Sequence, residues 1–301
     1  MKKIQHPRIG KVTWRCGLAI ALLALTKLAL ASDKPAQRIV SVGGAVTEII
    51  YALGAQARIV GVDTTSLWPE STRGLPQVGY LRNLSAEGVL SLNPDLVITT
   101  VDAGPPEALE QIRGVGVQVT ILENDPTAAG IAKKIRGTGQ AIGLAQSAEE
   151  LAASVESQLS RQSARVATID KKPAVLFLLS IGRGSPLASG VNTAANGIIE
   201  LAGGRNATDG YEGYKPISAE SLVAAAPDAI LVTNRTLAMM GGLDKLLEIP
   251  GIAATPAGLN KRIVAMDGLY LLGLGPRTPQ AVADFTAKLH PQLSSQASAT
   301  Q

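Results

Sequence analysis

A stretch of 17 residues in the first half of the chain recurs in the second half at a constant spacing of 133 positions. Residues 84–100 align with residues 217–233, and six of the 17 positions are identical, among them a Ser-Ala-Glu start and a Pro-Asp pair. In each copy a segment with helical spacing leads through Pro-Asp into an apolar run short enough for a buried strand. The repeat therefore predicts two similar α/β units within one chain.

The segments around the first copy alternate between strand-like and helix-like patterns. Such alternation indicates a parallel sheet covered by helices on both faces. In the second unit, the first strand is expected at 174–179 and the strand of the repeat at 229–233. In the first unit, the expected strands are 38–42, 58–62, 95–100 and 118–122, and the expected helices are 47–53, 85–92 and 106–113.

Residues 147–169 form a longer helical segment without glycine or proline. Ser147 and Glu150 have the spacing of a capping box, which predicts a helix that starts there. A helix of this length would span roughly 35 Å, enough to cross a small domain. We therefore expect an α/β fold in which two similar lobes with central parallel sheets are joined by one long α-helix.

The first 31 residues have the pattern of a cleavable secretory signal peptide. A basic start precedes the short apolar run 17–25, and Ala29-Leu30-Ala31 has the form of a cleavage site. An N-terminal anchor helix is the alternative, but the apolar run is short for a span and Lys27 interrupts it. The predicted organisation is a signal peptide (1–31), an N-terminal lobe (32–146), a linker helix (147–172), a C-terminal lobe (173–292) and a polar tail (293–301).

The composition after residue 31 excludes several classes of chemistry. The leader holds six of the 28 Lys and Arg residues and no acidic residue, so the remainder carries a net charge of −2 and nucleic acid is not an expected partner. The remainder has no cysteine, and its one histidine, His290, follows a predicted final helix. A histidine-based catalytic triad and a His/Cys zinc site are therefore not expected. Carboxylate, phenolate and methionine remain as ligands for a metal.

The order of these elements resembles the helix-linked class of periplasmic substrate-binding proteins of ABC importers, which is class III of the periplasmic binding proteins. The resemblance covers about residues 38–290 and depends on the Arg-Ile-Val-Ser-Val opening at residue 38, the repeated unit and the long helix. This class carries cobalamin, ferric siderophores and haem. The resemblance implies a monomeric, non-enzymatic periplasmic protein that passes its cargo to an inner-membrane ABC permease dimer with its ATPase.

Four motifs are similar to those of the haem-binding branch of this class: residues 79–88, 203–207, 214–216 and 267–277. The resemblance implies that Tyr80 is the axial ligand of the haem iron, and that haem arrives through an outer-membrane receptor. Tyrosine is among the known axial haem ligands. A free phenol ionises only at a pH of about 10, so iron and a nearby cation must favour the phenolate. Arg82, two residues further along an extended loop, is such a cation.

Haem also needs apolar walls and partners for two propionates. Arg235 follows the strand 229–233, at the edge where ligands gather in α/β sheets, and is expected on a loop that faces Tyr80 or a propionate. Each candidate has an ordinary alternative as a core or surface residue. The further candidates are Tyr214, Lys215, Trp68, Met239, Arg183 and Arg277. Some members of the family offer a histidine where this chain has residues 181–184, which contain none. We therefore expect five-coordinate iron.

Glu87 and Glu220 hold the same place in the two copies of the repeat, each in the first turn of a predicted helix. A carboxylate there also stabilises any helix through its dipole. In the family, one glutamate per lobe meets arginines of the permease, and a pseudo-twofold protein on a twofold partner needs one such contact per lobe. The resemblance thus implies that this pair docks the protein.

Two other functions remain open. The same fold could carry a ferric siderophore or cobalamin, although a single tryptophan after residue 31 disfavours the aromatic pocket that cobalamin usually meets in this family. A metal-chelatase-like enzyme on a two-lobed scaffold is the remote alternative, and the scarcity of histidine counts against it.

Overall fold

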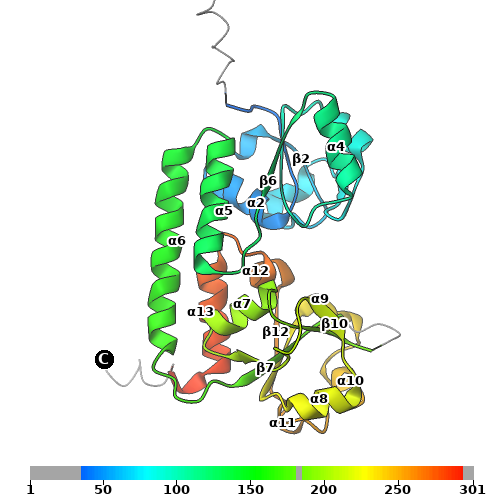
Figure 1. Ribbon diagram of the computed structural model, residues 1–301, viewed down its shortest axis with the longest axis vertical. Coiled ribbons are helices and arrows are strands. Elements are labelled where there is room, and N and C mark those ends of the chain that lie inside the picture. Colours follow the sequence, from blue (N-terminus) through cyan, green and yellow to red (C-terminus); the bar gives the residue numbers. More distant parts are fainter. Residues whose placement is uncertain (1–34, 181–184, 294–301) are drawn as a thin grey trace, which may run out of the picture. The chain divides into compact units, whose positions relative to one another are not determined.

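The computed structural model describes residues 35–180 and 185–293 (Figure 1). The expected signal peptide, Arg183 with the rest of 181–184, and residues 294–301 of the expected tail lie outside these residues. No helix in the described ranges is long and apolar enough to cross a membrane.

The first lobe contains a four-stranded parallel sheet in the order β2-β1-β5-β6. Its strands lie within one residue of the expected ones at either end, because each is a short apolar run between breaks. Helix α2 begins three residues earlier than expected, since Ala45 and Val46 extend its buried face. The elements are β1 (Ile39–Ser41), β2 (Ile59–Val62), β5 (Leu96–Thr100), β6 (Gln118–Leu122), α2 (Gly44–Ala52), α3 (Ala86–Leu90), α4 (Pro106–Gly114), and the 3₁₀ turns η1 (Gln56–Arg58) and η2 (Glu70–Gly74).

A small antiparallel hairpin, β3 (Gly79–Tyr80) with β4 (Asn83–Leu84), lies outside this sheet. Gly79 has a φ of +103°, and a Cβ there would lie 3.2 Å from the Asn83 carbonyl oxygen, so the hairpin needs glycine at its entry. The backbone of Gly104 donates to the Leu81 carbonyl (3.0 Å) and accepts from Leu84 (2.8 Å). These bonds fix the hairpin to the turn that follows β5.

The second lobe contains a six-stranded sheet that is not wholly parallel. Strands β7 (Ala174–Ser180), β11 (Ala229–Thr233) and β12 (Ile263–Met266) are parallel, and β9 (Arg205–Asn206) pairs with β7 in the same direction. Strands β8 (Leu187–Ser189) and β10 (Tyr214–Pro216) are antiparallel, at one edge. The helices are α7 (Ala194–Leu201), α8 (Ala219–Ala225), α9 (Asn234–Met239), α10 (Leu243–Leu247), α11 (Pro256–Leu259), α12 (Gly268–Leu272) and α13 (Thr278–Leu289).

The sequence repeat has a structural reason in both lobes. Ser85 and Ser218 cap α3 and α8. The side-chain oxygen of each accepts a hydrogen bond from the backbone N–H of the residue three positions later, at 3.1 and 3.2 Å. The Asp95 carboxylate accepts the backbone N–H that leads into β1 (3.0 Å), and Asp228 accepts the N–H of the first residue of β7 (2.8 Å). The Pro-Asp pair thus fixes a neighbouring central strand in each lobe, which explains why it recurs.

The long helix is α6 (Ala145–Val166), and it lies beside α5 (Ala128–Ala141) along much of its length (Figure 1). The expected capping box is wrong, because α6 begins at Ala145 directly after a tight turn and its N-cap, Leu144, makes no side-chain cap. The helix ends three residues before the expected limit at 169. Arg136 of α5 bonds Glu149 (2.7 Å) and Glu156 (2.9 Å) of α6, so the two helices form one unit.

One apolar core extends from the first lobe into the second. It contains Ile49 of α2, Ile131 of α5, Val155 of α6, Phe177 of β7 and Phe285 of α13, all at most 1% exposed. Helix α13 also packs on α6. The two lobes are therefore joined by packed helices as well as by one continuous chain.

Candidate functional site

A phenol, a guanidinium and a carboxylate meet beside the hairpin of the first lobe. Tyr80 ends β3 with 45% of its surface exposed, and Arg82 lies in the two-residue turn. Arg82 Nη1 donates a hydrogen bond to Tyr80 Oη at 2.9 Å, and its Nη2 lies 3.8 Å from Asp102 Oδ1. Asp102 follows β5, at the carboxyl end of the parallel strands. The expected pairing of Tyr80 with Arg82 is therefore present in the geometry, on a tyrosine that is partly exposed.

Two residues behind Asp102 were missed by sequence reasoning. Asn124 Nδ2 donates to Asp102 Oδ2 at 2.6 Å, and Asn124 Oδ1 accepts from Lys134 Nζ at 2.5 Å. Asn124 follows β6 at the same carboxyl edge, so the rule that ligands gather there could have found it. Lys134 shares the buried face of α5 with Ile131, three residues before it, and Thr138, four residues after it. A lysine on such a face is unusual and could have pointed to a functional role.

Tyr214 brings the second lobe toward this group. It lies on β10, half-buried, with its ring edge-on to Phe177 at 6.3 Å. Burial raises the pKa of Tyr214, and the charge of Arg82 lowers it while that of Asp102 raises it. The hairpin of the first lobe and the edge strand of the second are thus within electrostatic reach of each other.

Three more candidates lie on the second lobe. The Lys215 ammonium lies 5.4 Å from the centre of the Tyr211 ring, and Lys215 is exposed on β10. Arg235 is exposed, but it is in the first turn of α9 and not on a loop as expected, because Thr233 caps a helix directly after β11. Met239, at the end of α9, is 77% exposed.

Arg277 and Trp68 belong to a contact between the lobes. The Arg277 guanidinium bonds the Glu48 carboxylate at 2.5 and 3.0 Å and lies over the rings of Trp68 (4.6 Å) and Tyr270 (5.1 Å). Burial raises the pKa of Glu48, and the bond from Arg277 opposes that rise. Arg277 thus has an internal counter-ion, whereas half of Trp68 remains exposed.

Glu87 and Glu220 are exposed in the first turns of α3 and α8, as the repeat predicts. Bonds from its own backbone N–H and from Ser218 hold the pKa of Glu220 below its ordinary value. The two carboxylates therefore have equivalent places on the two lobes.

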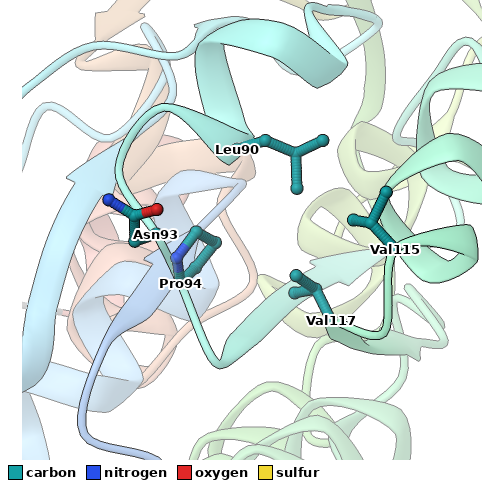
Figure 2. Close-up of a pocket in the computed structure, with 5 residues that line it drawn as sticks. All are labelled: Leu90, Asn93, Pro94, Val115 and Val117. Atoms are coloured by element: carbon teal, nitrogen blue, oxygen red, sulfur yellow. The ribbon is translucent and has the colours of Figure 1, made fainter.

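An open hollow of about 420 Å³ lies elsewhere, between Leu90, Asn93, Pro94, Val115 and Val117 (Figure 2). These residues precede β5 and β6, whereas Asp102 and Asn124 follow the same strands. The hollow is thus at the opposite edge of the sheet from Tyr80. Among the described residues, no three His, Cys, Asp or Glu side chains are grouped as a metal site.

The fold of this chain is similar to solved structures of periplasmic heme-binding proteins. The chain is similar to the periplasmic heme-binding protein RhuT from Roseiflexus sp. RS-1 (TM-score 0.82, 47% identity, 85% of this chain and 99% of the other). It is also similar to the periplasmic heme-binding protein BhuT in complex with two hemes (TM-score 0.81, 41% identity, 85% and 98% covered).

Curated sequences add two relatives. One is an uncharacterized ABC transporter substrate-binding lipoprotein, YvrC, of Bacillus subtilis, 26% identical over 86% of this chain and 81% of that protein. The other is a vitamin B12-binding protein of Vibrio campbellii, 24% identical over 74% and 80%. The profile of the family described as periplasmic binding protein matches residues 39–269. The chain therefore belongs to the periplasmic binding protein family.

Proposed function

We propose that this chain is the substrate-binding protein of an ABC importer, that its cargo is haem, and that the Tyr80 phenolate is the axial ligand of the ferric iron. The observation that carries the proposal is the exposed Tyr80 side chain, whose hydroxyl has Arg82 Nη1 at 2.9 Å. Ferric iron prefers a hard anionic oxygen, and an adjacent guanidinium favours the ionised phenol. The likeness to two heme-binding proteins at 47% and 41% identity supports the same cargo.

The second lobe offers groups suited to the rest of a haem. Arg235 and Lys215 are exposed and form no ion pair within the described ranges, so each is free to meet a propionate. Exposed Met239 and Trp68 supply apolar surface for the porphyrin. Arg277 is the weaker partner for a propionate, because Glu48 already neutralises its charge.

Delivery is the second half of the proposed function. The protein is exported to the periplasm by its leader, takes up haem that has passed an outer-membrane receptor, and acts as a monomer. It then docks on an inner-membrane permease dimer with its ATPase. Glu87 and Glu220 support this step, because they are exposed at equivalent places of the two lobes.

Titration of the purified protein with hemin, a ferric siderophore panel and cyanocobalamin tests the cargo. Wild type should bind hemin with a tyrosinate-to-iron charge-transfer band. Tyr80→Phe should lose that band and weaken binding by more than about a hundredfold. Removing a residue that merely supports a metal ligand already costs up to about a hundredfold in affinity, and removing the ligand itself should cost more. Tyr51→Phe, a tyrosine on α2, is the matched control and should bind as wild type.

The same titration decides the alternative. Vitamin B12-binding relatives make cobalamin the second candidate. Preference for cyanocobalamin or a siderophore over hemin would replace the proposed cargo, and an unchanged band in Tyr80→Phe would move the ligand to another residue.

A further inference from the structure

Lys134 is a buried lysine that the proposed function does not use. Only 2% of its surface is exposed, and burial lowers its pKa to about 8. Lysine is almost never fully buried unless it is paired, and an isolated buried charge is costly. An alanine or methionine at this place on α5 would complete the apolar face beside Ile131 and Ile135. The lysine is thus unfavourable for packing alone, and its polar contacts must account for it.

These contacts form a chain that leads to the Tyr80–Arg82 pair. Lys134 donates to Asn124 Oδ1 (2.5 Å), and Asn124 Nδ2 donates to Asp102 Oδ2 (2.6 Å). The other oxygen of Asp102 faces the Arg82 guanidinium at 3.8 Å. We refer to Asp102, Asn124 and Lys134 as the relay.

In each hydrogen bond of the relay a donor faces an acceptor that suits it. An asparagine presents an acceptor at one atom and donors at the other, and here the acceptor faces an ammonium while the donor faces a carboxylate. Leucine at position 124 could make neither bond, and aspartate could not donate to Asp102. Charge-assisted bonds of this kind are the stronger ones, and each fixes the rotamer of the next group.

The far end of the relay touches the second lobe. Lys134 Nζ also lies 3.3 Å from the carbonyl oxygen of Leu274, in the loop between α12 and α13. Leu274 is 1% exposed and has a φ of +55°, so its carbonyl is held in an uncommon backbone conformation that points it at α5. The Lys134 ammonium therefore connects the chain of contacts that leads to Tyr80 with the backbone of the second lobe.

Given the proposed function, we propose that the relay positions Arg82 on the Tyr80 oxygen and couples that bond to the Leu274 contact between the lobes. An intact relay keeps the guanidinium on the Tyr80 oxygen, where its charge would support a bound ferric haem. A partner that shifts the Leu274 carbonyl away from Lys134 breaks this contact, releases the relay and frees Arg82. The Tyr80 oxygen then loses the hydrogen bond and the adjacent positive charge that Arg82 supplies.

The test uses the full protein with two variants one residue apart on α5. Lys134→Met removes the ammonium at nearly constant volume, and Lys133→Met makes the same change on the exposed face. Lys134→Met should release ferric haem about fivefold faster, because a fivefold change corresponds to the net contribution of one hydrogen bond. Its charge-transfer band should move in the same direction as that of Arg82→Ala. Lys133→Met should match wild type in both measurements.

A double variant separates a relay from a general loss of structure. If Lys134 acts through Arg82, Lys134→Met should add nothing to Arg82→Ala, since a shared path is not additive. Additive shifts, or wild-type values in Lys134→Met, would overturn the proposal. Asp102→Asn repeats the test at a partly exposed position should Lys134→Met fail to fold, and wild-type values there would overturn it equally.

A haem-free measurement keeps this inference apart from the cargo. The ¹³Cζ resonance of Tyr80, identified by its absence in Tyr80→Phe, should shift in Lys134→Met and stay in place in Lys133→Met. If wild type binds no hemin, the proposed function fails while this resonance still decides the relay. If hemin binds through Tyr80 and neither resonance nor band responds to Lys134→Met, the relay alone is wrong.

Discussion

The Arg277 guanidinium donates two hydrogen bonds to the Glu48 carboxylate, at 2.5 and 3.0 Å, across 229 residues of sequence. Glu48 belongs to α2 of the first lobe, and Arg277 is the residue from which α13 of the second lobe begins. The carboxylate is 6% exposed, and the rings of Trp68 and Tyr270 cover the guanidinium. The pair is thus a two-point connection between the lobes whose carboxylate is buried.

Removal of one partner of this pair should destabilise the protein strongly. Arg277→Met leaves an uncompensated carboxylate in a buried place and should lower the free energy of unfolding by about 3 kcal/mol. Arg113→Met, which breaks an exposed pair with Glu110, is the control and should cost no more than about 1 kcal/mol. Urea unfolding measures both values. Equal losses would mean that the buried pair is no stronger than the surface one.

Lys134 should make the stability of the protein rise in alkaline solution. Its pKa is about 8 in the folded protein and 10.5 when exposed, so between these values the unfolded chain binds more protons. The free energy of unfolding then increases with pH. Relative to Lys134→Met, wild type should gain about 3 kcal/mol from pH 7.5 to 10.5, and Lys133→Met should keep that gain. Parallel pH profiles for wild type and Lys134→Met would contradict the lowered pKa.

The lobes should move little when ligand binds. The α5–α6 pair, the shared core and the Glu48–Arg277 pair all join them. Binding proteins whose domains close do so at flexible hinges, and α6 has no glycine or proline between Ala145 and Val166. Small-angle scattering of the haem-free and haem-loaded protein should give the same radius of gyration within error. A clear compaction on loading would show a hinge.

Charge reversal should separate delivery from binding. Glu87→Lys with Glu220→Lys should leave hemin affinity intact and stop haem uptake by vesicles that contain the permease and its ATPase. Each single reversal should give a partial loss, because charge pairs at a rim steer and orient association. Glu107→Lys, in the first turn of α4 but outside the repeat, should transport normally. Normal uptake by the double variant would leave these glutamates as helix-end charges only.

The strands could be predicted because local pattern determines them. The run at 118–122 and the run at 229–233 are strands with those bounds, since each is a short, mainly apolar segment next to an acidic residue, Glu123 or Asp228. The antiparallel strands β8 and β10 were not predicted, because each has only three residues and neither forms an apolar run. The start of α6 was missed for a related reason: the turn after α5 determines it, while the Ser147 motif only resembles a cap.

The site was predictable only where one motif holds its residues. Tyr80 and Arg82 are two positions apart, so a hairpin brings them together without help from the rest of the chain. Asn124 and Lys134 come from a strand end and a helix, and only the fold places them behind Asp102. Arg277 was a further candidate for the ligand, at the end of the 267–277 motif, whereas the buried Glu48 that neutralises its charge lies 229 residues away.

The hairpin that carries Tyr80 and Arg82 has consequences for how such proteins diversify. It has two residues in its turn, its two strands pair with each other, its backbone bonds to Gly104 and Thr64, and Leu84 packs in the core of the lobe. Backbone bonds do not depend on the side chain of the bonded residue, so exposed Arg82 can be exchanged while the hairpin stays attached to the lobe. If Tyr80 and Arg82 bind the cargo as proposed, substitutions in this short hairpin can change the preferred cargo while the sheet beneath it stays the same.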